Sequence, residues 1–413
     1  MKGTIFIILL LVSLTISEKA RYDNYRVFEI SIETSQQLQL MEYIESNPDG
    51  YRFMEFPGKV GRNAELVVPP HKFAEFEELC SKFSLKSALL INNLQEVFDQ
   101  EQPRSRRALP LDWTRYWTLE EIHSWMESIA AENSNASIIS VGTSYEGRNI
   151  LGLKLNIGNV SGKKQIIFEG TIHAREWISG ATVTWMLNEL LTSTDPEVQQ
   201  LAATYEWIIV PVLNVDGFVY TWTNDRFWRK TRRPTANLLC RGADPNRNWD
   251  NNFNRGGSSS NPCSDLYAGD YPFSEPETKQ FSEFIANLTN LVGYFDFHAY
   301  GQLLMLPYGF TTEILENYDE LYEIGTIALE SLSAKFGTQY RIGSIANIIY
   351  IASGSSLDWL KYEFKTNVTY AYELRDQGRY GFALPADQII DTAIETFESI
   401  KTILKEAQIR GIA

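Results

Sequence analysis

Short runs of β-branched and aromatic residues alternate with helix-period stretches through most of residues 108–413. The strand-like runs lie at 137–142, 151–156, 165–169, 206–212, 292–298 and 367–373. The helix-period stretches lie at 119–131, 180–191, 275–286, 318–336, 355–361 and 386–403. Alternation of this kind is typical of layered α/β domains. Between them, residues 218–271 are rich in Gly, Asn and Ser, which predicts a long loop of the kind that often carries function.

A second, smaller pattern precedes this region. Residues 18–107 begin with a strand-like run at 25–33, a helix-period stretch at 36–45 and further strand-like runs at 51–56 and 65–68. A helix at 73–83 and a strand at 88–91 complete the order βαββαβ. This order predicts a small ferredoxin-like α+β domain.

The segment Gln-Pro-Arg-Ser-Arg-Arg-Ala at 102–108 is polar and strongly basic. Exposed segments of this kind are where proteases cut, although a solvated run of charges is the simpler interpretation. Because the segment separates a small domain from a large one, we expect a trypsin-like protease to cut after Arg107 and to release residues 108–413.

Residues 1–17 begin Met-Lys and continue as an apolar run ending in small residues. Such a segment is typical of a cleaved secretory signal and is too short to anchor the chain. We therefore expect a secreted, extracellular protein. In an oxidising compartment, Cys240 and Cys263 are expected to close a short disulfide loop, which leaves Cys80 unpaired.

Charge and hydropathy exclude two classes of partner. The chain carries 37 basic and 52 acidic residues, a net charge of −15 that would repel polyphosphate, so we expect no nucleic-acid partner. A basic cluster at 226–233 alone would suit heparin or nucleic acid, but acidic residues surround it. No apolar run of membrane-spanning length follows the first twenty positions, so we expect no membrane partner, and we expect a monomer.

Reactive residue types follow three of the predicted strands. His173 follows the strand-like run at 165–169, His298 ends the run at 292–298, and Glu373 ends the run at 367–373. Because the carboxyl ends of strands in an open α/β sheet converge, these residues and Glu176 are expected to meet at one edge. Two imidazoles and a carboxylate with an open position describe a catalytic zinc site, and a free carboxylate nearby can take a proton from water. A His-x-x-Glu pair alone often arises by chance. The metal site is favoured because this pair occurs together with His298 and Glu373 at matching strand ends.

Six segments, in unbroken order from about Asp112 to the C-terminus, resemble the motifs of the zinc metallocarboxypeptidases, in particular the digestive, pancreatic-type procarboxypeptidases A and B. They are His173-Ala-Arg-Glu176, Arg226-Phe-Trp-Arg229, Asp244-Pro-Asn-Arg247, Phe297-His298, Tyr350-Ile-Ala-Ser-Gly and the stretch from Tyr372-Glu373 to Gly-Phe382. Residues 18–107 resemble the propeptide of that family. The resemblance implies a mixed, mostly parallel twisted sheet with helices on both faces. It also implies a secreted zymogen that acts in a digestive lumen. The enzyme is expected to bind one zinc ion per chain and to release single C-terminal residues from proteins and peptides.

The resemblance implies chemical roles for five residues. The zinc ligands are matched by His173, Glu176 and His298. Glu373 matches the general base that activates water, and Arg229 matches the residue that stabilises the oxyanion. These residue types suit the roles, because a fixed cation favours a state in which negative charge develops on oxygen.

Other matched residues bind substrate or support the ligands. The group that grips the terminal carboxylate is matched by Asn246, Arg247 and Tyr350, and a guanidinium fork fits a planar carboxylate. The neighbouring subsites are matched by Arg175, Tyr300 and Phe382. Asp244 matches the carboxylate that orients His173, an arrangement that fixes the tautomer of a ligating imidazole.

Specificity is predicted from the pocket residues. Leu357 matches the pocket floor, which is apolar in A-type enzymes and an aspartate in B-type enzymes, and the nearby walls are matched by Met305, Ile345 and Ala371. An apolar floor favours C-terminal aromatic or aliphatic residues, because a buried basic head group would be unpaired. Asp296 departs from the A-type pattern, and strand alternation places it on the same face as His298. An ionised Asp296 in the pocket would instead favour C-terminal Arg or Lys.

Two other classes of function remain as alternatives. A secreted binding protein descended from a peptidase would lack a ligand or the base, and the sequence lacks neither. A serine hydrolase built on the serines of 353–356 would need a nucleophile elbow and a partner histidine, and neither is evident there.

Overall fold

The structure, a computed structural model, describes residues 19–101 and 111–413. The expected signal at 1–17 and the expected cleavage site at Arg107 lie outside these residues. Within the described part of the chain, no helix combines the length and apolar character needed to cross a membrane.

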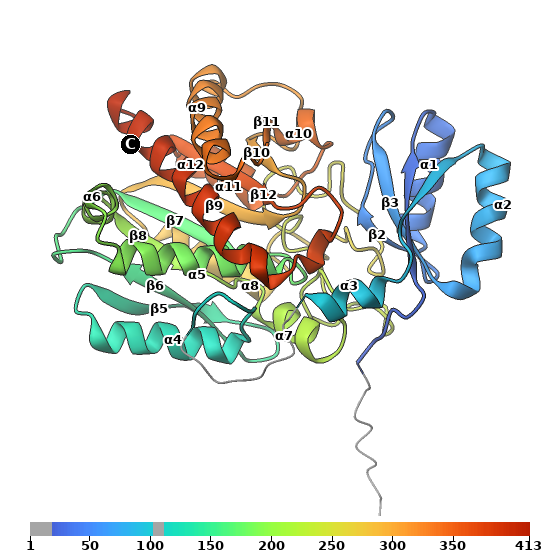
Figure 1. The fold of residues 1–413 in the computed structure, drawn as a ribbon, viewed down its shortest axis with the longest axis horizontal. Helices are drawn as coiled ribbons and strands as arrows, with labels where there is room; N and C mark the ends of the chain where they lie inside the picture. Colours follow the sequence, from blue (N-terminus) through green and yellow to red (C-terminus); the bar gives the residue numbers. More distant parts are fainter. Residues whose placement is uncertain (1–18, 102–110) are drawn as a thin grey trace, which may run out of the picture.

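The N-terminal unit, blue in Figure 1, is an antiparallel sheet with two helices on it. Its strands run in the order β2-β3-β1-β4, the sheet order of a ferredoxin-like fold. Its elements are β1 (Arg26–Ser31), α1 (Ser35–Ser46), β2 (Arg52–Glu55), β3 (Asn63–Val68), η1 (Pro70–Lys72), α2 (Phe73–Phe83) and β4 (Lys86–Ile91). Thr34 caps α1: its hydroxyl accepts a hydrogen bond from the Gln37 backbone N–H. The Gln37 side-chain oxygen accepts one from the Thr34 backbone N–H, which completes a capping box. The predicted order βαββαβ is confirmed.

The larger unit is built on an eight-stranded sheet in the order β11-β10-β12-β9-β7-β8-β6-β5. The strands are β5 (Ala136–Thr143), β6 (Asn149–Leu155), β7 (Gln165–Gly170), β8 (Glu206–Val210), β9 (Leu291–Ala299), β10 (Leu303–Leu306), β11 (Arg341–Ser344) and β12 (Val368–Leu374). The central strands β12, β9, β7 and β8 are parallel to one another, whereas β6, β5 and β10 join antiparallel. The predicted mixed, mostly parallel sheet is thus confirmed.

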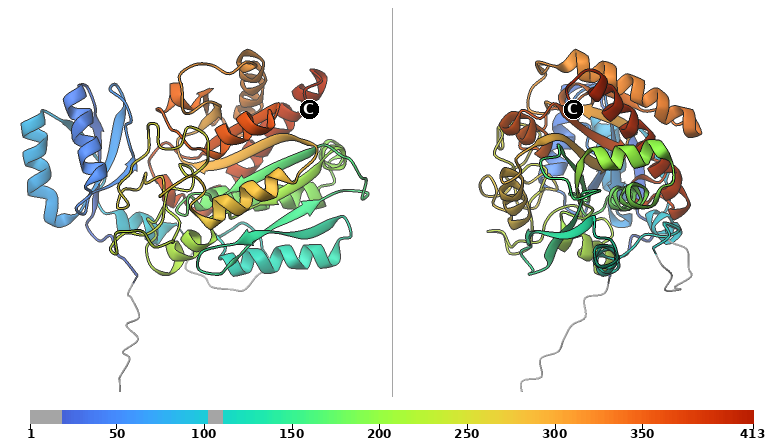
Figure 2. Two further views of the ribbon diagram at one scale, coloured as in Figure 1. Left: turned by 180° about the vertical axis from the view of Figure 1, so that it is seen from behind. Right: turned by 90° about the vertical axis from the view of Figure 1, so that its left-hand side faces the viewer.

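Helices cover both faces of this sheet. They are α4 (Leu119–Glu132), α5 (Trp177–Thr192), α6 (Pro196–Thr204), α7 (Val215–Thr223), α8 (Pro276–Ala286), α9 (Tyr318–Phe336), α10 (Ile345–Ile348), α11 (Ser356–Phe364) and α12 (Ile389–Ile409), with short turns η2 (Gly381–Ala383) and η3 (Ala386–Gln388). Helix α12 packs against α5 and α9 on one face, and α8 lies on the opposite face (Figure 2). Phe168 and Phe295 of the central strands are fully buried between these layers. The core therefore fixes the strand ends that carry the reactive residues.

Residues 224–275 form no helix and no regular strand, so the predicted long loop is confirmed over most of its length. Its first residues were predicted wrongly, because they belong to α7. Within the loop, Cys240 and Cys263 form a disulfide bond with their Cα atoms 5.0 Å apart, and Cys80 is free. The loop is therefore covalently closed next to the carboxyl ends of the central strands.

The two units are joined by α3 (Leu94–Gln100) and the residues after it. Glu101 is buried and forms an ion pair with Arg226, whose guanidinium also donates to the Phe382 carbonyl. Tyr22 donates to Asp225, and Arg52 forms an ion pair with the same carboxylate at 2.9 Å. The N-terminal unit is thus bound to the larger one through buried polar contacts, at the end of the sheet seen on the right of Figure 1.

Candidate active site

The parallel register of the central strands brings the expected ligands together. His298 lies near the end of β9, and Glu373 lies directly opposite it on β12. On the other side of β9, strand β7 ends at Gly170, and the chain then turns through His173 to Glu176, which precedes α5. Residues separated by up to 200 positions therefore share one sheet edge, as the strand-end pattern predicts.

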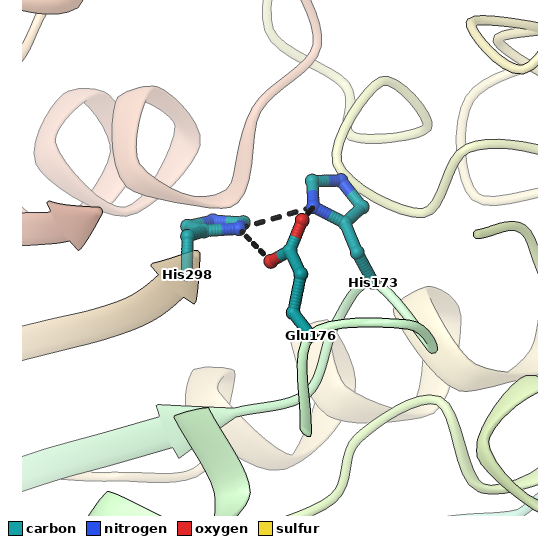
Figure 3. A group of neighbouring side chains, drawn as sticks. All are labelled: His173, Glu176 and His298. Carbon is teal, nitrogen blue, oxygen red and sulfur yellow. Dashed lines mark hydrogen bonds and ion pairs between the residues drawn. The ribbon is translucent and has the colours of Figure 1, made fainter. Parts of the chain in front are cut away.

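His173, Glu176 and His298 form a buried cluster (Figure 3). The Nδ1 atom of His173 lies 2.9 Å from Glu176 Oε1, and the Nδ1 atom of His298 lies 3.0 Å from Glu176 Oε2. One ligand atom from each residue lies within 4.8 Å of the other two. Because all three side chains offer electron pairs to one point, the cluster fits the two-imidazole, one-carboxylate set of catalytic zinc sites.

Each histidine of the cluster has a carboxylate behind it. The Nε2 atom of His173 lies 3.1 Å from Asp244 Oδ1, and the Nε2 atom of His298 lies 3.0 Å from Asp296 Oδ2. Burial would raise the pKa of Asp244, but Arg229 and His173 hold it well below its ordinary value. Arg229 donates to Asp244 Oδ2 at 2.8 Å, so its guanidinium lies beside the cluster.

The placement of Asp296 differs from the sequence interpretation. Its side chain shares a face with His298, as strand alternation requires, but it is 0% exposed and does not line the cavity described below. Its carboxylate accepts hydrogen bonds from Ser356 and His298 instead. The geometry therefore gives no support to Asp296 as a receptor for a basic substrate side chain.

Glu373 is the carboxyl group near the cluster that is left uncommitted. Its Oε2 atom is buried and has no hydrogen-bond partner among the described residues. Burial, reinforced by the Glu176 carboxylate, raises the pKa of Glu373 to about 8 despite the opposing effect of His298. Such a group is suited to exchange a proton with a reacting molecule.

Arg247, Asn246 and Tyr350 form a polar group beside the cluster. Arg247 is buried, and its guanidinium donates to the Gly257 and Asn246 carbonyls at 2.8 Å and to the Tyr350 hydroxyl at 3.3 Å. The Asn246 amide nitrogen lies 3.0 Å from His298 Nε2. A buried guanidinium with neutral partners is a strong recognition group for an anion.

Arg175, Tyr300 and Phe382 form a second group. The Arg175 guanidinium lies 4.1 Å from the centre of the Phe382 ring, and the rings of Tyr300 and Phe382 are 5.0 Å apart. Tyr300 also donates a hydrogen bond to Glu65 of the N-terminal unit.

A cavity of about 1040 Å³ joins these groups. Most of the predicted site residues line it, namely His173, Arg175, Glu176, Arg229, Asn246, Arg247, His298, Tyr300, Tyr350, Glu373 and Phe382. Asp244 lies behind His173, and Leu357 is buried in the core without lining the cavity. Of the predicted wall residues, Met305 and Ile345 line it, and Ala371 does not.

Sequence reasoning missed several residues of this cavity. Ile349 and Ala352 add apolar lining near Tyr350, and Arg52, Phe56 and Glu65 line it from the N-terminal unit. Ile349 lies directly before the Tyr350 motif and Ala352 lies within it, so their position in the sequence was a usable signal. The contacts of the N-terminal unit left no such signal, because they depend on how two separately folded units dock.

Comparison with known families matches both units of the chain. Residues 122–399 match the family described as "Zinc carboxypeptidase", and residues 28–101 match the one described as "Carboxypeptidase activation peptide".

Individual proteins give the same picture. The chain is 42% identical over 406 residues to "Zinc carboxypeptidase A 1" of Anopheles gambiae, covering 97% of this chain and 93% of the relative. It is 45% identical over 297 residues to "Carboxypeptidase B" of Astacus astacus, covering 71% of this chain and 97% of the relative. The crystal structure of carboxypeptidase A from Helicoverpa armigera superposes with a TM-score of 0.85 at 28% identity, covering 94% of this chain and 99% of that one.

Proposed function

Because this chain belongs to the zinc carboxypeptidase family and carries that family's activation peptide, we propose that it is a secreted zymogen whose active form releases C-terminal aromatic or aliphatic residues. One observation carries the proposal. The cavity that contains the His173–Glu176–His298 cluster also contains the uncommitted Glu373 and the buried Arg247. A metal site, a base and a carboxylate receptor in one cavity are the parts that a carboxypeptidase needs.

The proposed chemistry assigns a step to each of these groups. His173, Glu176 and His298 would hold a zinc ion, which would supply Lewis-acid activation of water and of the scissile carbonyl. Glu373 takes a proton from the attacking water and returns it to the departing amine, so that bond cleavage leaves two neutral groups to equilibrate with solvent. The guanidinium of Arg229 stabilises the negative charge that develops on the carbonyl oxygen.

Substrate selection in this proposal begins at the terminal carboxylate. Arg247 grips the carboxylate with help from Asn246 and Tyr350, which restricts cleavage to the last peptide bond. Arg175, Tyr300 and Phe382 then line the subsites for preceding residues. Asp244 orients His173 through their 3.1 Å contact.

The apolar lining supports the A-type preference. Met305, Ile345 and Ile349 line the cavity. Leu357, which matches the position of the B-type aspartate, is buried in the core and does not line it. Asp296 is fully buried and does not line the cavity, so it offers no carboxylate to a basic side chain there. A desolvated Lys or Arg head group would be costly in such a lining.

For the whole chain we propose three segments. Residues 1–17 act as the secretory signal, 18–107 as the activation propeptide, and 108–413 as the catalytic domain. A trypsin-like protease cuts after Arg107, and the active monomer then acts on proteins and peptides with a free C-terminus, in a digestive lumen.

A release assay after trypsin treatment tests the activity. The cleaved protein should release single C-terminal amino acids from peptides, lose this activity in phenanthroline and regain it when zinc is restored. Activity that survives complete removal of the metal would contradict the mechanism.

Matched peptides test the specificity. Four peptides that differ only in a C-terminal Phe, Leu, Arg or Lys should give higher kcat/KM for Phe and Leu. Faster release of Arg or Lys would contradict the A-type preference and would support Asp296 as the receptor for the basic side chain.

A further inference from the structure

Asp296 is a fully buried carboxylate that the proposed reaction does not use. It lies two residues before His298 on β9, so both side chains project from the same face of the sheet. Its Oδ2 atom lies 3.0 Å from His298 Nε2 and 3.0 Å from the Ser356 hydroxyl, which donates to it. Ser356 begins α11, so the carboxylate is held between the sheet and a helix.

A second carboxyl group supports Asp296 from the neighbouring strand. Glu169 of β7 lies directly opposite Asp296 in the parallel register and is also fully buried. The Tyr294 hydroxyl donates to Glu169 at 3.1 Å. Two adjacent buried carboxyl groups do not both ionise, and burial together with the charge of Asp296 raises the pKa of Glu169 well above its ordinary value. Of the two, Glu169 is therefore the group in which the protonated form is favoured.

The orientation of His298 depends on which of its nitrogens carries a proton. A carboxylate only accepts hydrogen bonds, so the contact with Asp296 places the proton of a neutral His298 on Nε2. The Asn246 amide also lies near Nε2, but the backbone N–H of Ser356 donates to its oxygen and turns its donor side toward His298. Asn246 cannot accept that proton, and Asp296 can.

We propose that Asp296 is a positioning residue for the metal site: it accepts the Nε2 proton of His298 and so keeps the Nδ1 electron pair directed at His173 and Glu176. The inference rests on the zinc site of the proposed function and adds to it a second carboxylate–histidine pair beside Asp244–His173. It also replaces the substrate-pocket interpretation of Asp296. Groups that support a ligating imidazole in this way typically change metal affinity by roughly 10- to 100-fold.

Zinc affinity of the full-length chain tests the proposal directly. The metal-free protein is titrated with zinc against a chromogenic chelator, for the wild type and for Asp296→Ser, Asp296→Asn and Glu169→Gln. Asp296→Ser should weaken zinc binding by roughly 10- to 100-fold. Asp296→Asn keeps an acceptor oxygen but loses the charge, so it should weaken binding by a smaller factor. Glu169→Gln places a neutral polar side chain of nearly the same size opposite Asp296 and should bind zinc within about twofold of the wild type.

The matched control is Asp216→Asn. Asp216 is also a fully buried aspartate that accepts a serine hydroxyl, from Ser144, but it does not line the cavity. The Asp216→Asn variant should have a lower free energy of unfolding than the wild type but the same zinc affinity. Cobalt substitution adds a signature of ligand geometry: the visible absorption bands of the cobalt protein should shift in the Asp296 variants and remain unchanged in Asp216→Asn.

Three results would overturn the inference. The first is zinc affinity within twofold of the wild type in Asp296→Ser or, if that variant does not fold, an unchanged affinity in Asp296→Asn. The second is an equal loss of affinity in Asp216→Asn, which would show a general effect of destabilisation. The third is a wild-type protein that takes up no zinc, which would overturn the proposed function itself and this inference with it.

Discussion

Glu373 gives the sharpest prediction for a single residue, because its Oε2 atom has no hydrogen-bond partner among the described residues. Because that oxygen hydrogen-bonds to no neighbouring residue, its replacement by an amide nitrogen should leave the ligands in place. Glu373→Gln should lower kcat by about 10²–10⁴-fold, the range expected for loss of a general base. The variant should still contain one zinc per chain by metal analysis. Retention of substantial activity would remove Glu373 from the proposed mechanism.

Arg247 gives a prediction for substrate recognition. Its guanidinium has neutral partners in the described structure, so the charge is free to pair with the substrate carboxylate. Arg247→Ala should lower kcat/KM at least roughly tenfold, since hydrogen bonds to charged groups contribute about 1.5–3 kcal/mol. Inhibition by free carboxylates compared with their amides provides the control: the wild type should prefer the carboxylate, and the variant should not distinguish them.

Single residues also show how far the sequence could predict the site. His173, His298 and Glu373 were predictable because each lies at or after a strand end, and the strands are parallel neighbours. For Asp296, the predicted face of the strand was correct, but the prediction that its side chain enters the substrate pocket was wrong. Alternation along a strand determines the face from which a side chain projects. Whether that side chain reaches a cavity or contacts a neighbouring imidazole depends on how side chains from different elements pack together.

Among the elements, the contact between β3 and the loop after β9 makes a prediction about pH. Glu65 of β3 accepts from the Tyr300 hydroxyl, and burial raises the pKa of Glu65 to about 8. The negative charges of Glu55, Glu29 and Asp376 contribute to this rise in pKa, and the hydrogen bond from Tyr300 opposes it. An undocked propeptide exposes Glu65 and returns the pKa to its ordinary value near 4.5, so the docked state holds the proton more tightly.

The sign of the effect follows from this difference. Docking has its full strength below about pH 4.5 and weakens as the pH rises to about 8, by up to about 1.4 kcal/mol per unit. Size-exclusion chromatography of the cleaved but undissociated protein should therefore show more free propeptide at pH 8 than at pH 5. Glu65→Gln should flatten this dependence, whereas Glu77→Gln, exposed on α2, should preserve it. An unchanged slope in Glu65→Gln would contradict the prediction.

The elements that were missed are mostly short. Strands β10 and β11 have four residues each, and α6 and α7 have nine each. Such segments carry too few residues for a periodic pattern to emerge, and tertiary contacts decide their conformation. The nineteen-residue helix α9 was predicted with correct ends because several turns repeat the same apolar face. Helix α12 was predicted at 386–403 but spans Ile389–Ile409, so both of its predicted ends were wrong.

For the whole molecule, the position of the N-terminal unit predicts latency. Phe56 packs edge-on against Tyr350 with ring centres 6.1 Å apart, and Gly58 lies against the same ring. The unit therefore covers residues proposed to grip the substrate. Uncut protein should hydrolyse long peptides much more slowly than trypsin-treated protein, and N-terminal analysis of the active fragment should begin at Ala108. Equal rates before and after the cut would contradict it.

The overall architecture was predictable, but the docking of its two units was not. The order of strands and helices separates a small α+β unit from a large α/β unit, and both are present. Their relative position depends on contacts such as Glu101–Arg226 and Arg52–Asp225. Each of these ion pairs joins residues that lie more than a hundred positions apart in the chain. No local sequence pattern predicts such a contact.

The position of β12 has a consequence for how the protein is made. It is the last strand in the sequence, yet it lies between β10 and β9 and contributes Glu373. A nascent chain therefore holds its metal-binding residues before it holds its base. A chain that stops before β12 would lack both Glu373 and an internal strand of the sheet, so it could neither complete the core nor supply the base.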